Sequence, residues 1–279
     1  LAFENSVCSE QECKSSPGES EERLMLKNCD NFRDMGGIRT RDGHVIKEGK
    51  IIRSGKLSEL TDRETAFLGE YGVRDDVDFR TAAERKNEPD RIPDVVSYHF
   101  APVFPENDRT RSGESKWESR RDYYVDANAA ANDMIEAYNG IVLEDCAKKA
   151  YREFFEVLLA NDRDGESVLF HCSAGKDRTG MGAVYFLTAL GVDKADIRAD
   201  YLASNRYLKA QQDKEHARAV DKGEIFAQNI FNLGSVSESY LDCALGTINN
   251  EYGGLDSYLT NELGLGARER EDLRRIYLR

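Results

Sequence analysis

The chain has 279 residues, of which 40% are hydrophobic, including 13 tyrosines and 12 phenylalanines. This size and apolar content favour one large domain or two small ones with a proper core, and they exclude disorder over most of the length. Acidic residues outnumber basic ones by 52 to 39, for a net charge of -13. This charge repels phosphate backbones and anionic lipid at long range, which disfavours nucleic-acid binding as the main activity. Any phosphate group that the chain handles therefore requires a local basic site. No apolar run reaches the roughly 18–20 residues of a membrane-spanning helix.

The N-terminal residues differ in composition from the rest. Residues 1–23 are polar and rich in Glu and Ser, and we expect a mobile tail ahead of a single domain over 24–279. The six cysteines are too few and too scattered for a disulfide framework, and no His lies near the first three to complete a zinc site. A disulfide among the first three cysteines, Cys8, Cys13 and Cys29, would require an oxidising compartment. The sequence leaves open whether such a disulfide forms. Because the first residue is not Met, we favour a secreted or cell-envelope location slightly over the cytoplasm.

Predicted strands and helices alternate along the chain. The capping box Thr61-x-x-Glu64 begins a helix that Gly72 ends, and apolar residues predict strands over 73–79 and 95–103. A short buried strand is predicted at 167–171. Spacing of 3.6 residues predicts helices at 127–138, 144–161 and 179–190. Asp193 caps a further helix that continues to about residue 209. The final third is helical, with a second capping box at Ser235-x-x-Glu238. This order predicts an α/β fold with a central, mostly parallel sheet of four or five strands surrounded by helices.

One segment has no clear place in that alternation. Residues 105–121 are long, charged and almost without aliphatic side chains, so we expect a surface loop, with a lid over the site as the alternative. On the helix that follows, Met134 and Tyr138 lie one turn apart; we expect core packing, with a pocket wall as the alternative. The remaining histidines have no metal-ligand spacing: His44, His99 and His216.

The stretch His171-Cys172-Ser173-Ala174-Gly175-Lys176-Asp177-Arg178-Thr179-Gly180 lies between the buried strand and the start of a helix. Successive peptide N–H groups and a helix N-terminus converge in such a loop, and both favour an anion. The thiolate of Cys172 would be stabilised there and become a nucleophile. Arg178 can hold two phosphate oxygens at once. A nucleotide P-loop is excluded, because Lys176 is followed by Asp177 and Phe170 stands where a Gly is required.

The other members of this loop have supporting roles. Ser173, Ala174 and Gly175 supply backbone donors, the Thr179 hydroxyl can reach the sulfur, and the His171 ring can support the loop. Lys176 adds a second positive charge at the lip, which suits a substrate with more than one phosphate; the alternative is a solvated lysine that balances Asp177.

These residues resemble the cysteine-dependent protein tyrosine phosphatases, and more narrowly a bacterial branch of atypical phosphatases with the loop His-Cys-x-x-Gly-Lys-Asp-Arg-Thr-Gly. Other landmarks of that branch occur in order from about residue 28 to the C-terminus: Asn31-Phe32-Arg33-Asp34-Met35-Gly36-Gly37, Gly49-x3-Arg53-Ser54-Gly55-x-Leu57, Asp78-Phe79-Arg80-x3-Glu84, Asp200-Tyr201-Leu202, Tyr252-Gly253-Gly254, Tyr258-Leu259 and Leu263-Gly264. Phe79 stands where the family usually has Leu.

The resemblance implies a two-step hydrolysis without metal or cofactor, in which Cys172 forms a thiophosphate and Arg178 stabilises the transferring group. Phosphotyrosine is the implied substrate, with phosphoserine, phosphothreonine and phosphoinositides as additions. Because Trp117 is followed by Glu-Ser, the Trp-Pro-Asp loop of better-known relatives is absent. The implied general acid is Asp177; Asp78 is second, although we slightly favour a structural ion pair between Asp78 and Arg80.

Two other functions remain open. An arsenate reductase would need a second cysteine near Cys172, which only the folding of Cys146 or Cys243 could supply. A phosphate-binding module without turnover would have no need of the nucleophile.

Overall fold

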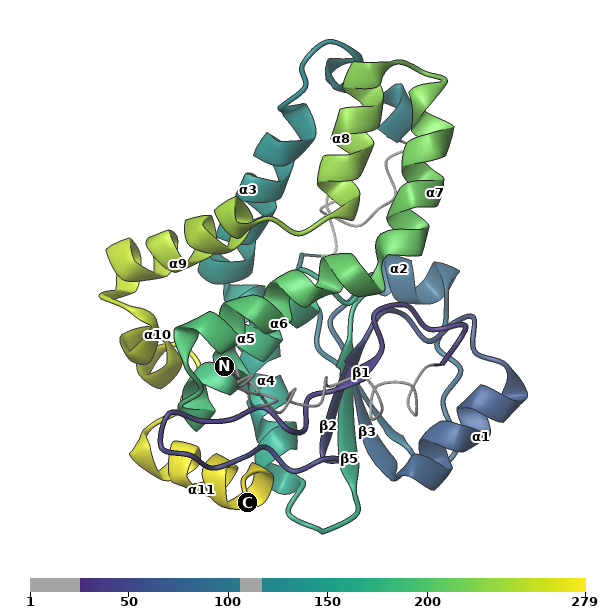
Figure 1. The fold of residues 1–279 in the computed structure, drawn as a ribbon. Helices are drawn as coiled ribbons and strands as arrows, with labels where there is room; N and C mark the ends of the chain where they lie inside the picture. Colours follow the sequence, from purple (N-terminus) through teal and green to yellow (C-terminus); the bar gives the residue numbers. More distant parts are fainter. Residues whose placement is uncertain (1–25, 106–116) are drawn as a thin grey trace, which may run out of the picture.

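The computed structural model describes residues 26–105 and 117–279 (Figure 1). The predicted tail, with Cys8 and Cys13, and most of the charged segment 105–121 lie outside the described residues. The tail disulfide and the lid therefore stay predictions.

Within the described residues, five strands form one sheet in the order β1-β2-β5-β3-β4. Their bounds are β1 (Arg33–Asp34), β2 (Ile51–Ser54), β3 (Val73–Asp78), β4 (Ser97–Phe100) and β5 (Ser167–His171). β1 pairs antiparallel with β2, and every other pairing is parallel. This confirms the predicted, mostly parallel sheet. All residues of the central strand β5 are buried, as its apolar sequence predicts.

Helices surround the sheet and make up the C-terminal part of the chain, as predicted. The described α-helices are α1 (Asp62–Tyr71), α2 (Ala82–Asn87), α3 (Ala129–Leu143), α4 (Asp145–Ala160), α5 (Arg178–Leu190), α6 (Lys194–Tyr207), α7 (Lys209–Val220), α8 (Glu224–Gly234), α9 (Glu238–Tyr252), α10 (Leu255–Asn261) and α11 (Ala267–Tyr277). Two short 3-10 helices, η2 (Trp117–Ser119) and η3 (Asp122–Tyr124), precede α3.

The two faces of β5 bury different sets of side chains. Val168 and Phe170 belong to the main core with residues of α4, α5 and α11, whereas Leu169 packs with Ile52 and with Leu68 of α1. Figure 1 shows α1 on one side of the sheet and α4, α5 and α11 on the other. Each fully buried side chain of this size contributes about 1.5–3 kcal/mol, so the centre of the sheet is a firm support for the loop that follows β5.

Two of the three predicted helix caps are confirmed. The Thr61 hydroxyl accepts a hydrogen bond from the Glu64 amide, and the Glu64 carboxylate accepts one from the Thr61 amide, at 3.3 and 2.9 Å. The Asp193 carboxylate caps α6 through the Ala195 amide.

The predicted cap at Ser235 is wrong by two residues. α9 begins at Glu238 and its cap is Ser237, whose hydroxyl accepts from the Ser239 amide. Both serines offer a hydroxyl, but Val236 between them is buried, so the chain passes through the core before the helix can begin. Burial of Val236 therefore selects the second serine over the first.

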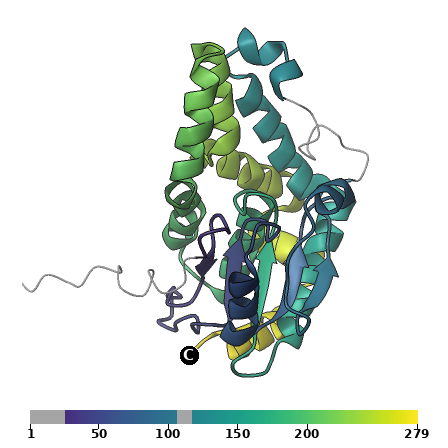
Figure 2. The ribbon, with the colours of Figure 1, turned by 90° about the vertical axis from the view of Figure 1, so that its right-hand side faces the viewer.

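A group of helices lies beyond the sheet, where α3, α7 and α8 rise above the rest of the molecule (Figures 1 and 2). Phe226 and Ile230 of α8 pack with Ala130 of α3 and with Tyr123 of η3 in a separate small core. Asn229 is fully buried between them; its side-chain oxygen accepts from the Ala130 amide at 2.9 Å and its amide group donates to the Tyr123 carbonyl at 3.0 Å.

Candidate active site

The predicted anion loop connects β5 to α5, at the carboxyl end of the central strand. Parallel α/β sheets bind ligands at this edge. Gly175 within the loop has φ +67, and a Cβ atom there would lie 2.3 Å from the Ser54 carbonyl oxygen at the end of β2. Only glycine allows the loop to pack this closely against the neighbouring strand.

Polar side chains from distant parts of the chain hold the loop from below. The Asn31 side-chain amide and the Arg53 guanidinium both donate to the Gly175 carbonyl, at 2.8 and 2.9 Å. Asp200 of α6 forms ion pairs with Arg53 and with Arg33. Burial raises the pKa of Asp200, but the two guanidinium groups outweigh this effect and hold it below the usual range. The sequence marked these residues as landmarks and gave them no role.

Arg178 is held in place by Glu84 of α2, which the sequence analysis did not select as a site residue. The two side chains form a bidentate pair, with Nη1–Oε2 and Nη2–Oε1 distances of 2.8 and 2.9 Å. Burial raises the pKa of Glu84, but mainly Arg178 lowers it, to about 2. The same carboxylate accepts from the Ser173 hydroxyl at 2.5 Å and from the Thr81 amide in a capping box. The guanidinium is therefore preorganised. The Thr81-x-x-Glu84 spacing indicates the start of α2, but it does not connect Glu84 with Arg178.

Two side chains donate hydrogen bonds to the Asp177 carboxylate. The Tyr138 hydroxyl donates to Oδ1 at 2.9 Å, and Lys176 Nζ donates to Oδ2 at 2.8 Å. Lys176 is buried, with 5% of its surface exposed, and its ammonium also contacts the Ser235 carbonyl. The lysine is therefore not a solvated charge at the lip. It balances Asp177, as the alternative interpretation held, but from a buried position.

His171 lies behind the loop among acidic side chains. Its Nε2 atom is 3.3 Å from oxygens of both Asp76 and Asp90, and Nδ1 is 3.2 Å from the Cys172 carbonyl. Burial lowers the pKa of His171, but the carboxylates of Asp78, Asp76 and Asp90 outweigh it and raise the pKa well above its usual value. The contact of Nδ1 with the Cys172 carbonyl places the ring directly behind the loop.

Asp78 forms the structural ion pair that we favoured. Its Oδ2 atom accepts from Arg80 Nη2 at 2.8 Å and from the Tyr98 hydroxyl at 2.7 Å, and the carboxylate is fully buried. It is not among the described residues that line the pocket, whereas Asp177 is.

Three ligand-type atoms of Asp76, Asp90 and His171 lie within 4.8 Å of one another. The Asp90 oxygen that faces His171 also accepts from the Arg80 guanidinium. A metal ion would have to compete with Arg80 and His171 for that oxygen, so we assign the cluster as an ion-pair network behind the loop.

Two further expectations about the site change. The Thr179 hydroxyl is buried and has no hydrogen-bond partner among the described residues, so the predicted contact with the Cys172 sulfur is not present. Cys146 and Cys243 are free thiols that contact the Val103 carbonyl and the Asn139 side chain, and neither is among the described pocket-lining residues. The second cysteine of an arsenate relay is therefore not supplied by either.

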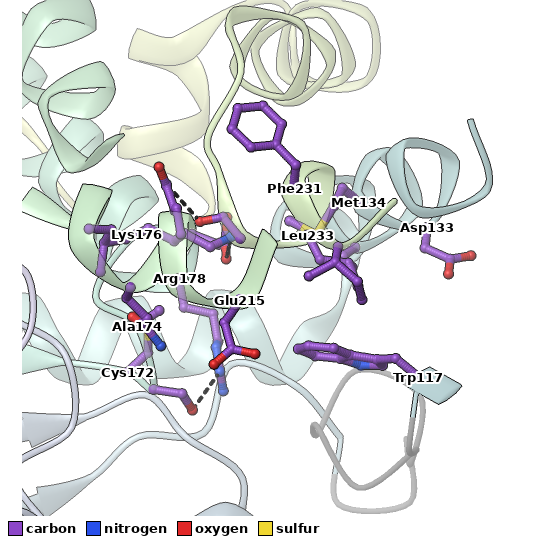
Figure 3. Close-up of a pocket in the computed structure, with 18 of the residues that line it drawn as sticks. Trp117, Asp133, Met134, Cys172, Ala174, Lys176, Arg178, Glu215, Phe231 and Leu233 are labelled. Atoms are coloured by element: carbon purple, nitrogen blue, oxygen red, sulfur yellow. Dashed lines mark hydrogen bonds and ion pairs between the residues drawn. The ribbon is translucent and has the colours of Figure 1, made fainter. Parts of the chain in front are cut away.

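A cavity of about 730 Å³ opens above the loop. Six predicted site residues line it: Cys172, Ser173, Ala174, Lys176, Asp177 and Arg178. Figure 3 shows Cys172 and Arg178 at one end of the cavity and Trp117 below Met134 and Leu233, with Phe231 beyond them. Met134 and Tyr138 both belong to the main core, as expected, and Met134 also forms part of the cavity wall. His171, Gly175, Thr179 and Asp78 are buried and are not among the described residues that line the cavity.

Comparison with known proteins agrees with this geometry. The model of the tyrosine phosphatase family matches residues 24–279. A protein of Cupriavidus necator that bears a tyrosine-protein phosphatase name is 30% identical over 240 residues, which cover 86% of this chain and 84% of the relative. The triple specificity protein phosphatase of Mycobacterium tuberculosis is 30% identical, covering 82% of this chain and 90% of the relative. A tyrosine-protein phosphatase of Nostoc commune is 28% identical, covering 82% and 74%. With this coverage, the chain belongs to the tyrosine phosphatase family.

Proposed function

We propose that this tyrosine phosphatase works through a cysteine nucleophile, with Cys172 forming a thiophosphate intermediate on the way to free phosphate. The observation that carries the proposal is that Cys172, Asp177 and Arg178 line one cavity, with Arg178 already oriented by Glu84. No step requires a metal or an organic cofactor.

In the first step, the Cys172 thiolate attacks phosphorus and the bond from phosphorus to the substrate oxygen breaks. Asp177 gives its proton to that leaving oxygen. In the second step, a water molecule attacks phosphorus, the phosphorus–sulfur bond breaks, and Asp177 takes up the proton of the water. Arg178 and the loop amides stabilise the charge on the three equatorial oxygens in both steps.

The substrate range is part of the proposal. Phosphotyrosine in proteins is the main substrate class, and phosphoserine, phosphothreonine and phosphoinositides are the additional classes to be tested. The single domain over 24–279 carries all of this chemistry.

The test is phosphate release, with a chelator present, on a phosphotyrosine peptide, a phosphoserine peptide and phosphatidylinositol phosphates. We expect Cys172→Ser to lose at least about 10³-fold in kcat, since the hydroxyl is a far weaker nucleophile at neutral pH. Cys146→Ser and Cys243→Ser are the matched controls, because both thiols lie outside the pocket. Wild-type activity in the Cys172→Ser variant, or loss of activity on chelation, would count against the mechanism.

A further inference from the structure

The cavity above Cys172 is larger than a phosphotyrosine side chain requires. Its volume of about 730 Å³ falls in the range of sites that enclose a whole drug-sized ligand. The phosphate and ring of the substrate fill the end next to the loop, which leaves the space between the helices unfilled. We call this space the outer pocket and define it by residues Trp117, Asp133, Glu136, Glu215, Phe231 and Leu233 (Figure 3).

The charges that line the cavity do not suit a second phosphate group. Among the described lining residues, five carry a carboxylate and three carry a cation. Each of those cations already has a carboxylate partner: Arg178 pairs with Glu84, Lys176 with Asp177, and Arg120 with Asp122 and Asp133. Once its first phosphate reached the loop, a polyanionic headgroup would therefore find no cation without a carboxylate partner among the described lining residues.

The outer pocket instead has the features that bind a long cationic side chain. Trp117 and Phe231 expose 41% and 44% of their surfaces, which is high for large aromatic rings. Glu215 of α7 lies at the same opening, and among the described residues its carboxylate pairs with the exposed Arg218 one turn away. Arginine and lysine combine an apolar stem, which packs on aromatic rings, with a charged head that a carboxylate attracts.

We propose that the outer pocket binds an arginine or lysine that neighbours the phosphotyrosine of a protein substrate. The proposal rests on the proposed function and narrows it: the preferred substrates are basic phosphotyrosine segments rather than phosphoinositide headgroups. The net charge of -13 acts in the same direction, because it attracts basic segments at long range and repels anionic membranes.

The test compares kcat/KM on three phosphotyrosine peptides that differ only in whether Arg, Ala or Glu flanks the phosphotyrosine. Phosphatidylinositol 4,5-bisphosphate in phosphatidylcholine vesicles is the fourth substrate. For the wild-type chain we expect the Arg peptide to exceed the Glu peptide by about tenfold at low salt, and the ratio to shrink as salt is added. Glu215→Lys should reduce that ratio by at least about threefold. Asp213→Lys is the matched control, because it makes the same change of charge on the same helix outside the pocket, and it should keep the wild-type ratio.

The outcomes separate the two proposals. Three outcomes would overturn the outer-pocket proposal and leave the cysteine mechanism intact. The first is equal kcat/KM on all three peptides, and the second is an equal fall of the Arg-to-Glu ratio in Glu215→Lys and Asp213→Lys. The third is faster turnover of the vesicles than of the Arg peptide. Absence of turnover on every phosphotyrosine peptide would instead overturn the proposed function itself.

Discussion

Glu84 lies outside the nucleophilic loop but binds two of its side chains, those of Arg178 and Ser173. One carboxylate orients the Arg178 guanidinium, accepts from the Ser173 hydroxyl and caps α2 through Thr81. Its loss leaves a buried guanidinium without its counter-charge, which is more costly than the net value of the ion pair. Site geometry and local stability thus depend on the same two oxygen atoms.

We predict that Glu84→Gln lowers kcat/KM by about 10- to 100-fold and the free energy of unfolding by about 2–3 kcal/mol. The pKa of Glu84 is about 2 in the folded chain, below its ordinary 4.5, so its contribution to stability is complete above pH 4.5 and is lost as the pH falls toward 2. Urea denaturation at several pH values should therefore show a difference between wild type and variant that shrinks below pH 4.5.

Glu88→Gln is the control for Glu84→Gln, because Glu88 ends the same helix but pairs with Lys56 in an exposed position. It should change neither measurement appreciably. A Glu84→Gln enzyme with wild-type kcat/KM would show that Arg178 does not need this partner.

At the scale of elements, the register of the sheet creates the acidic surroundings of His171. β3 pairs with β5 so that Asp78 lies opposite His171 and Asp76 lies opposite Leu169. Asp76 is fully buried, and no oxygen of its carboxylate has another hydrogen-bond partner among the described residues. Burial raises the pKa of Asp76 to about 6, and attraction to His171 is the main effect that opposes this rise.

We predict that wild-type stability falls as the pH rises above about 6.5. The folded-state pKa of His171 lies above that of the unfolded chain, so its contribution is complete below 6.5 and is lost as the pH rises through the folded value. Asp76→Asn removes one of the carboxylates that hold the proton, and the fall should then occur at lower pH. Denaturation between pH 6 and 9 measures both curves.

The control for Asp76→Asn is Asp75→Asn, since Asp75 is the preceding residue on the strand and pairs with the partly exposed His99. Identical pH profiles for wild type and Asp76→Asn would mean that this carboxylate does not hold the proton on His171.

The elements whose signals are local were predictable from sequence. β5 follows from its short apolar run within 167–171, and the cap at Thr61 follows from its own three-residue spacing. The nucleophilic loop was predictable for the same reason, because its residues are contiguous. Glu84 and Arg53 approach that loop from elsewhere in the chain, so spacing alone gave them no role. The cap at Ser237 was missed because burial of Val236, a tertiary effect, selects it.

At the scale of the whole molecule, the pocket joins two packing units. The loop belongs to the sheet and its core, whereas Phe231 and Leu233 belong to the group of α3, α7 and α8, which has a small core of its own. That small core buries few side chains, so the polar contacts of Asn229 hold a large share of its geometry.

We predict that Asn229→Ala separates substrate binding from chemistry. Its side chain bonds the Ala130 amide and the Tyr123 and Asp126 carbonyls, at 2.9, 3.0 and 2.7 Å, so the substitution leaves three backbone groups without partners. A loss of about 2–4 kcal/mol in the stability of this helical group should follow. Amide hydrogen exchange should then speed up in α7 and α8 while β5 stays protected, because the small core is separate from that of the sheet.

In steady-state kinetics, Asn229→Ala should raise KM about three- to tenfold and leave kcat within about twofold, since the reacting groups sit on the sheet side. Asn232→Ala is the matched control: it lies on the same helix and makes a 3.4 Å contact with the Ala127 carbonyl at an exposed position. It should reproduce wild-type exchange and kinetics. If Asn229→Ala lowered kcat as strongly as it raised KM, the helical group would act on the chemical step, and the division of the pocket into a catalytic floor and a binding wall would be wrong.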